Sequence, residues 1–98
     1  MSDFLQTDLE NNSAVPYFLW DEPMTVAELR RKLSSGSEAE QIRLLGKILR
    51  EARDTDVWKF KTPDEVWRNW SSLKPMLGRR RGFWEFLFGR WREEGFIG

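Results

Sequence analysis

The 98-residue chain contains no cysteine and no histidine. Without cysteine it has no disulfide, no thiolate nucleophile and no thiolate metal ligand. Without histidine it lacks the side chain that titrates near neutral pH and the commonest nitrogen ligand for metals. Ser/His/Asp and Cys/His catalysis are therefore excluded, which leaves carboxylates, lysines and hydroxyls. We predict a protein that is not an enzyme and has no cofactor and no metal site; a site built from carboxylates alone is the remaining alternative.

Long uncharged runs are also missing. No stretch of 18 residues is free of charge, so none has the character of a membrane span. The N-terminal sequence MSDFLQTDLE is acidic and lacks the basic region and apolar run of a signal peptide. We therefore expect a cytoplasmic protein. The length allows one domain with a modest core, which we place over residues 14–98 after an acidic, mobile arm over residues 1–13.

Three helix starts share one signature, a hydroxyl residue followed three positions later by a glutamate. In this capping box the two side chains satisfy backbone N–H groups of the first helical turn. The pairs are Thr25 with Glu28, Ser37 with Glu40, and Thr62 with Glu65. Apolar residues recur at helical spacing behind each start. We predict helices over about residues 26–33 and 38–53, a third beginning at Pro63, and a last one over about 79–94 that ends at Gly95. The fold class is all-α, an irregular bundle of about four helices.

The segments between these helices are predicted to be extended or turned. Ala14–Trp20 is an apolar, aromatic run, and Pro16 disfavours helical backbone at Val15, so we expect an extended segment packed over the core. Residues 56–61 alternate apolar and charged side chains, which indicates an extended linker or a turn. A short helix within residues 1–12 is an alternative to a mobile arm.

The chain is rich in aromatic residues, six of them tryptophans, and ten of the fourteen lie at or after Trp58. We assign Trp58, Trp67 and Trp70 to the core. Apolar side chains of the last helix cover about 200° of its circumference at 100° per residue, against the roughly 100° that a surface helix needs. Part of this surface is therefore predicted to be exposed as an interaction patch. Phe83 and Phe86 are the residues that we most expect to be exposed. A fully buried helix is the alternative.

Charge is distributed unevenly although the net charge is zero. Residues 1–29 carry six acidic and no basic residues, a net of −6, so residues 30–98 carry +6. The acidic segment can neutralise the basic body within one molecule, or the basic end can meet an acidic partner.

Aromatic and basic residues coincide in the last helix, so we predict that it binds a protein partner or a second copy of the chain. The anchors would be Trp84, Phe86, Phe88 and Trp91, next to Phe83, with Arg79, Arg80 and Arg81 at the polar rim. Nucleic-acid binding through phosphate contacts and base stacking is the main alternative, which the zero net charge disfavours. Binding to a membrane surface is disfavoured by the glutamates of the same helix.

Several short blocks carry a family resemblance. They are Phe18-Leu19-Trp20-Asp21, SGSEAE at 35–40, ILREAR at 48–53, DVWKF at 56–60 and TPDEV at 62–66. Over about residues 18–77 the chain resembles small bacterial proteins that are often encoded directly beside a nucleotidyltransferase acting as the toxin of a toxin–antitoxin pair. The segment Arg79–Phe83 departs from that pattern. The resemblance implies no catalytic residues, and it implies a helical accessory or antitoxin-like protein that is bound to, or co-expressed with, an enzyme partner.

Overall fold

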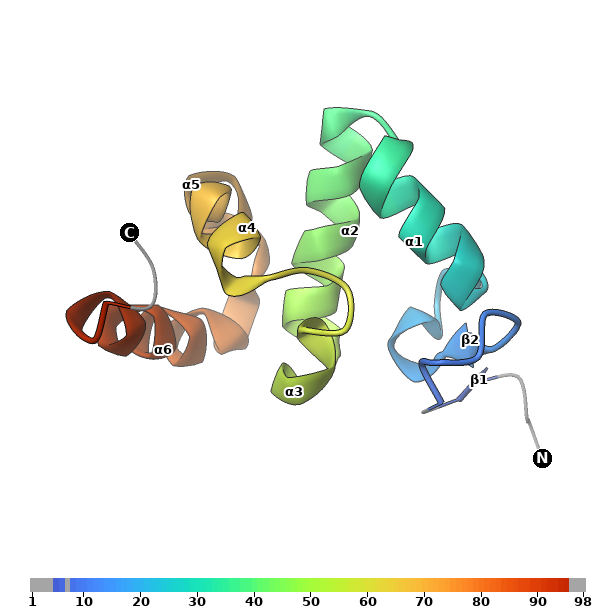
Figure 1. The fold of residues 1–98 in the computed structure, drawn as a ribbon, viewed down its shortest axis with the longest axis horizontal. Helices are drawn as coiled ribbons and strands as arrows, with labels where there is room; N and C mark the ends of the chain where they lie inside the picture. The colour runs from blue at the N-terminus through green and yellow to red at the C-terminus, as the bar shows by residue number, and fades with distance from the viewer. Residues whose placement is uncertain (1–4, 7, 96–98) are drawn as a thin grey trace.

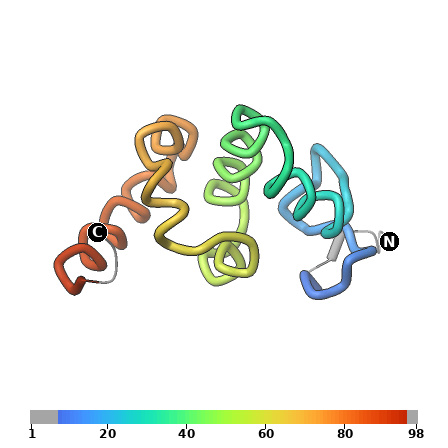
Figure 2. The backbone as a smooth tube through the Cα atoms, turned by 45° about the horizontal axis from the view of Figure 1, so that its top comes forward, coloured from blue at the N-terminus to red at the C-terminus, as the bar shows by residue number. Residues whose placement is uncertain are grey.

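The longest helix, α2 (Glu38–Glu51), lies at the centre of the protein (Figure 1). The computed structural model describes the backbone of residues 5–6 and all atoms of residues 8–95. The N-terminal elements and α1 lie on one side of α2, and α4, α5 and α6 lie on the other, an arrangement that the turned view repeats (Figure 2). The protein is elongated, with extents of 43 × 28 × 23 Å.

Helices dominate the described residues, which confirms the all-α class. The α-helices besides α2 are α1 (Val26–Ser35), α3 (Asp54–Val57), α4 (Pro63–Arg68), α5 (Trp70–Leu73) and α6 (Arg81–Glu93). Three 3-10 turns are η1 (Tyr17–Leu19), η2 (Lys74–Met76) and η3 (Gly78–Arg80). Two-residue strands β1 (Leu5–Gln6) and β2 (Val15–Pro16) pair in parallel.

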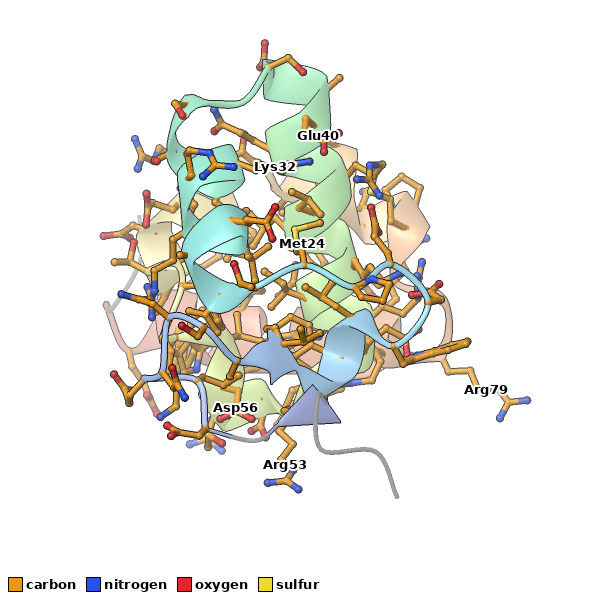
Figure 3. All side chains as sticks on the ribbon, turned by 90° about the vertical axis from the view of Figure 1, so that its right-hand side faces the viewer. Met24, Lys32, Glu40, Arg53, Asp56 and Arg79 are labelled. Atoms are coloured by element: carbon orange, nitrogen blue, oxygen red, sulfur yellow. The ribbon has the colours of Figure 1, made fainter. Side chains whose placement is uncertain are left out.

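The capping boxes predicted for α1 and α4 form completely. The Thr62 Oγ1 atom accepts the N–H of Glu65 at 3.2 Å, and the Glu65 carboxylate accepts the N–H of Thr62 at 2.9 Å. The hydrogen bond from the backbone N–H of Thr62 to the Glu65 carboxylate is the main cause that holds the pKa of Glu65 below its ordinary value. At α2 only half of the box forms, because the carboxylate of Glu40 pairs with Arg43 at 3.1 Å and faces Lys32 of α1 at 3.8 Å (Figure 3).

Several predicted helix bounds were wrong. The second helix stops at Glu51, and α3 occupies part of the segment expected to be a linker. The third is interrupted at Asn69, whose side-chain amide donates to the carbonyl of Glu65 at 2.8 Å and competes with the helical backbone. The last helix begins as the 3-10 turn η3 and ends as predicted near Gly95, which has a φ of 81°.

The aromatic N-terminal segment is extended only at Val15–Pro16 and then forms η1. Residues 5–6 are a strand, so the alternative of a helix is wrong there; residues 1–4 and 7 of that proposed helix lie outside the described residues. Leu9 is buried in the same core as the helices. Trp20, expected to pack with the rest of the segment, is 61% exposed.

An acidic turn after η1 covers the basic side of α2. The ammonium of Lys47, whose side chain is 8% exposed, pairs with Asp21 and lies 3.4 Å from Glu22. Arg43 holds the Glu22 carboxylate with contacts of 2.6 and 2.9 Å, and this hydrogen bonding is the main cause that lowers the pKa of Glu22. The acidic N-terminal part therefore neutralises basic residues of the same molecule, at least along this helix.

Tyr17 ties η1 to α3. Its hydroxyl donates to the Asp56 carboxylate at 2.6 Å and accepts the backbone N–H of Arg53 at 2.8 Å. Burial raises the pKa of Tyr17, and the carboxylate of Asp56 raises it further, while the N–H of Arg53 opposes the shift.

The raised pKa of Tyr17 predicts a loss of stability in alkali. A group whose pKa is higher in the folded than in the unfolded state contributes stability that is complete below the unfolded value, here about 10, and is lost as pH rises through the folded value. Since Tyr17 is the only tyrosine, absorbance at tyrosinate wavelengths reports its titration alone. We expect the denaturant midpoint to fall above this pH in the native chain. The fall should be smaller in Tyr17→Phe, where only the loss of lysine ion pairs remains, and an equal fall in that variant would contradict the assignment.

Removal of the capping hydroxyl of α4 should destabilise the protein. Thr62→Ala takes away the acceptor for the N–H of Glu65, and such caps contribute about 1 kcal/mol. Urea unfolding should show this loss in the free energy of unfolding. Thr55→Ala is the matched control, because Thr55 is exposed within α3 and caps no helix; a similar loss in both variants would show that the cap is not its cause.

Candidate functional site

The inner face of α6 is part of the hydrophobic core. Trp84 is fully buried and Phe88 is 1% exposed. Around them lies an aromatic cluster in which neighbouring ring centroids are 5.3 to 6.4 Å apart. Its further members, all partly buried, are Trp58, Trp67, Trp70 and Trp91. The prediction that Trp58, Trp67 and Trp70 pack with the core is confirmed.

Two of the predicted anchors are therefore corrected. Trp84 and Phe88 face α2, α4 and α5, so they have no surface to offer to a partner. Trp91 is half-buried against Trp58, with ring centroids 5.5 Å apart, and contributes only an edge. The width of the apolar face was correctly predicted from the sequence, but its direction depends on which side of the helix meets α2.

The segment η3–α6 also closes the C-terminus of α2. The last carbonyls of a helix have no partner within it. Here the indole N–H of Trp84 donates to the carbonyl of Leu49 at 2.9 Å, and the guanidinium of Arg80 donates to the carbonyl of Ala52 at 2.7 Å. The positive charge of Arg80 also suits the negative end of the helix dipole. Arg80 is thus a structural residue, and its predicted place at a binding rim is corrected.

The outer face of α6 is exposed and contains apolar side chains. Phe86 is 64% exposed and Phe83 is 41% exposed, which confirms the prediction for these two residues. On this face a Cβ atom added to Gly82 or Gly89 would meet nothing within 4 Å. We call this surface the α6 outer face; it comprises Arg79, Gly82, Phe83, Phe86, Gly89, Arg90 and Glu93.

The charged residues around the outer face differ in their pairing. Arg81 pairs with Glu85 at 3.0 Å, and Arg90 pairs with Glu94 at 3.1 Å, each one helical turn away. Arg79 is exposed and extends away from the body of the protein (Figure 3). Of the three arginines predicted at the rim, Arg79 is the one whose side chain has no hydrogen bond or ion pair among residues 8–95.

Trp20 is an exposed aromatic residue that the sequence prediction missed. It follows η1 and directly precedes the acidic turn Asp21–Glu22. The charged turn is the signal that could have identified it, since ion pairs with α2 hold this turn at the surface. Trp20 belongs to the N-terminal elements, on the other side of α2 from α6 (Figure 1).

Acidic residues elsewhere in the described chain are dispersed or paired. Within residues 5–6 and 8–95 no three Asp or Glu residues come together as metal ligands would. A hollow of about 300 Å³ between α2 and α4 is lined by Glu38, Lys61, Glu65 and Arg68 among others. The Glu65 carboxylate in it is already bound by Thr62 and by Lys61 at 3.4 Å. In the part of the chain that is described, no helix is both long and apolar enough to cross a membrane.

The different positions of two neighbouring arginines lead to a prediction. Arg80→Ala removes hydrogen bonds to the C-terminus of α2 and should lower the free energy of unfolding by about 1.5–3 kcal/mol, the typical contribution of a hydrogen bond from a charged group. Arg79→Ala removes a side chain without such contacts, so it should change the free energy of unfolding by less than about 0.5 kcal/mol. Urea unfolding of both variants checks this. Equal effects would contradict the structural assignment of Arg80.

The structure thus retains part of the predicted site. Phe83, Phe86 and Arg79 lie together on an exposed face, and Arg81 and Trp91 lie at its borders. Trp84 and Phe88 belong to the interior, and Arg80 binds the C-terminus of α2. Comparison of the chain with family models, curated proteins and solved structures gives no match. The functional argument therefore depends on the surface itself.

Proposed function

We propose that this protein is a non-catalytic, cytoplasmic helical module that docks on a protein partner through the α6 outer face. The observation that carries the proposal is the exposure of Phe86, 64%, on a helix whose opposite face contains the buried Trp84 and Phe88. Burial of a phenylalanine side chain is worth about 1.5–3 kcal/mol, which a partner can recover by covering it. Phenylalanine, tryptophan and arginine are also enriched at binding hot spots and interface cores.

The glycines of the outer face support the same proposal. Gly82 and Gly89 each destabilise a helix by about 1 kcal/mol relative to alanine. A Cβ atom at either position would meet nothing in the protein, so intramolecular packing does not require glycine there. A partner that approaches the helix backbone closely would require it. The two glycines flank Phe86 in sequence, so a single docked element would contact all three.

The resemblance to small proteins encoded beside toxin-type nucleotidyltransferases supports one kind of partner, an enzyme of that class. In this proposal the chain is an antitoxin-like or accessory protein that covers part of the enzyme or holds it in a complex. Such a role needs no catalytic residue in the chain itself, which agrees with the lack of cysteine and histidine.

Nucleic-acid binding has less support than protein docking. Of the three consecutive arginines, Arg80 is engaged with α2 and Arg81 with Glu85. Trp84 is buried and Trp91 is half-buried, so on α6 the two phenylalanines are the exposed rings on which bases could stack. Phosphate contacts would moreover compete with the acidic end of the same helix.

Substitution of the two exposed phenylalanines tests the docking surface. The partner is first identified by co-purification with the tagged chain from native cells and mass spectrometry, and its affinity is then measured by calorimetry. Phe83→Ala with Phe86→Ala should raise the dissociation constant about thirtyfold, the equivalent of ~2 kcal/mol for a hot spot. The fold should stay intact because both side chains are exposed.

Trp20→Ala provides the matched control, since Trp20 is an exposed aromatic residue that directly follows η1, far from α6 in the sequence. We expect it to leave the affinity unchanged. If the control weakened binding and the double substitution in α6 did not, the docking surface would lie on the N-terminal side, and our placement would be wrong.

A further inference from the structure

Three residues of the α6 outer face are spaced seven positions apart: Arg79, Phe86 and Glu93. Seven residues are close to two helical turns, so these side chains lie nearly on one line along the helix. The line begins with a positive charge, has an exposed aromatic ring at its centre and ends with a negative charge. Arg79 lies in η3, which runs directly into α6.

The charge order along this line determines which partner it fits. Two copies of such a line match when they run antiparallel, because each arginine then meets the glutamate of the other copy. In a parallel pair, arginine would face arginine and glutamate would face glutamate. We propose that the α6 outer face pairs with the same face of a second copy of this chain, in an antiparallel arrangement with the two-fold axis at Phe86.

The ends of the line are available for such pairing. Among residues 8–95, neither Arg79 nor Glu93 has an ion pair, whereas the neighbouring Arg81 and Arg90 are paired within α6. Arg79 is exposed and projects outward (Figure 3). At 1.5 Å per residue in α6, Glu93 lies about 10 Å from Phe86 along the helix. The larger rise of η3, about 2 Å per residue, places Arg79 about 11 Å from Phe86 in the other direction. A two-fold axis at Phe86 therefore brings both opposite-charge pairs into register at once.

The glycines fit the same register. With Phe86 on the axis, Gly89 is three positions after it and Phe83 is three positions before it. An antiparallel pair thus places Gly89 opposite Phe83 of the second copy. Since nothing occupies the space above Gly89, the phenylalanine ring can pack against its backbone and bring the axes close to the 8–10 Å of packed helices. The two Phe86 rings meet at the centre.

The size of the contact sets the expected strength. Helix α6 has 13 residues, a length of about 20 Å, so the pair is small among specific interfaces. We expect a dimer that exchanges rapidly with the monomer at micromolar concentrations. This inference rests on the proposed function in one respect, that the α6 outer face is a docking surface. Self-pairing would cover the face that an enzyme partner needs, so the two would compete.

Charge reversal at the ends of the line tests the arrangement in the full chain by sedimentation equilibrium. The native mass should rise from 11.7 kDa toward twice that value as concentration increases. Arg79→Glu and Glu93→Arg should each raise the dissociation constant at least threefold, because two like-charge contacts replace two opposite-charge ones. The double reversal should restore it to within about twofold, and about 0.5 M salt should reduce these differences through screening.

Two further variants separate this effect from general ones. Phe86→Ala should raise the dissociation constant at least tenfold. Arg31→Glu is the control: it changes the net charge by the same amount as Arg79→Glu, at an exposed site on α1. It should leave the dissociation constant of the dimer unchanged. A chain that stays monomeric at all concentrations, a double reversal that is weaker than either single one, or an unaffected Phe86→Ala would overturn the proposal.

The outcomes also separate this inference from the proposed function. If the chain is monomeric while the double phenylalanine substitution still weakens binding of the enzyme partner, docking stands and self-pairing fails. If charge reversal and its rescue change dimerisation as expected, while the double phenylalanine substitution leaves the affinity for the enzyme partner unchanged, self-pairing stands. The proposed docking surface for the enzyme is then wrong.

Discussion

The hydrogen bond from the indole N–H of Trp84 to the carbonyl of Leu49 is the contact on which the arrangement of the C-terminal half depends. It joins the buried face of α6 to the end of α2, where a carbonyl would otherwise remain unsatisfied beside apolar side chains. Arg80, one turn earlier, satisfies the carbonyl of Ala52 in the same way. These two donors fix both the position of α6 along α2 and its rotation about its own axis, and the aromatic cluster then fills the space around Trp84.

The rotation of α6 connects stability to the proposed function. Once Trp84 and Phe88 are fixed against the core, helical periodicity places Phe86 on the opposite side, where no part of the described chain covers it. The exposure of Phe86 is therefore a consequence of strong constraints on the inner face. A rotation of α6 that buried Phe86 would break the hydrogen bonds of Trp84 and Arg80 to the C-terminus of α2.

The N-terminal half follows a different principle, since it is held to α2 largely by charge and by one tyrosine. Asp21 and Glu22 neutralise Lys47 and Arg43, so the acidic N-terminal part and the basic helix form one neutral unit. Tyr17 reaches the segment after α2 through Arg53 and Asp56. Both halves thus pack against α2 and the segment that follows it, which leaves the far face of α6 and the exposed Trp20 as the apolar surfaces without an intramolecular partner in the described chain.

The sequence by itself determined the all-α class, the helix starts at Thr25, Ser37 and Thr62, and the excess of apolar surface on the last helix, because capping and helical periodicity are local properties of the chain. Tertiary structure decided most of the rest. The exposure of Trp20 depends on ion pairs between the acidic turn and α2, which are distant in the sequence. The break at Asn69 and the half-formed cap at Ser37 involve neighbours within one helical turn, Glu65 and Arg43, which compete with the regular pattern. Which aromatic residues of α6 became core and which became surface depended on where the helix meets α2. The rotation of α6 depends on the hydrogen bond that Trp84 donates to the carbonyl of Leu49, at the end of another helix and more than thirty residues earlier in the chain.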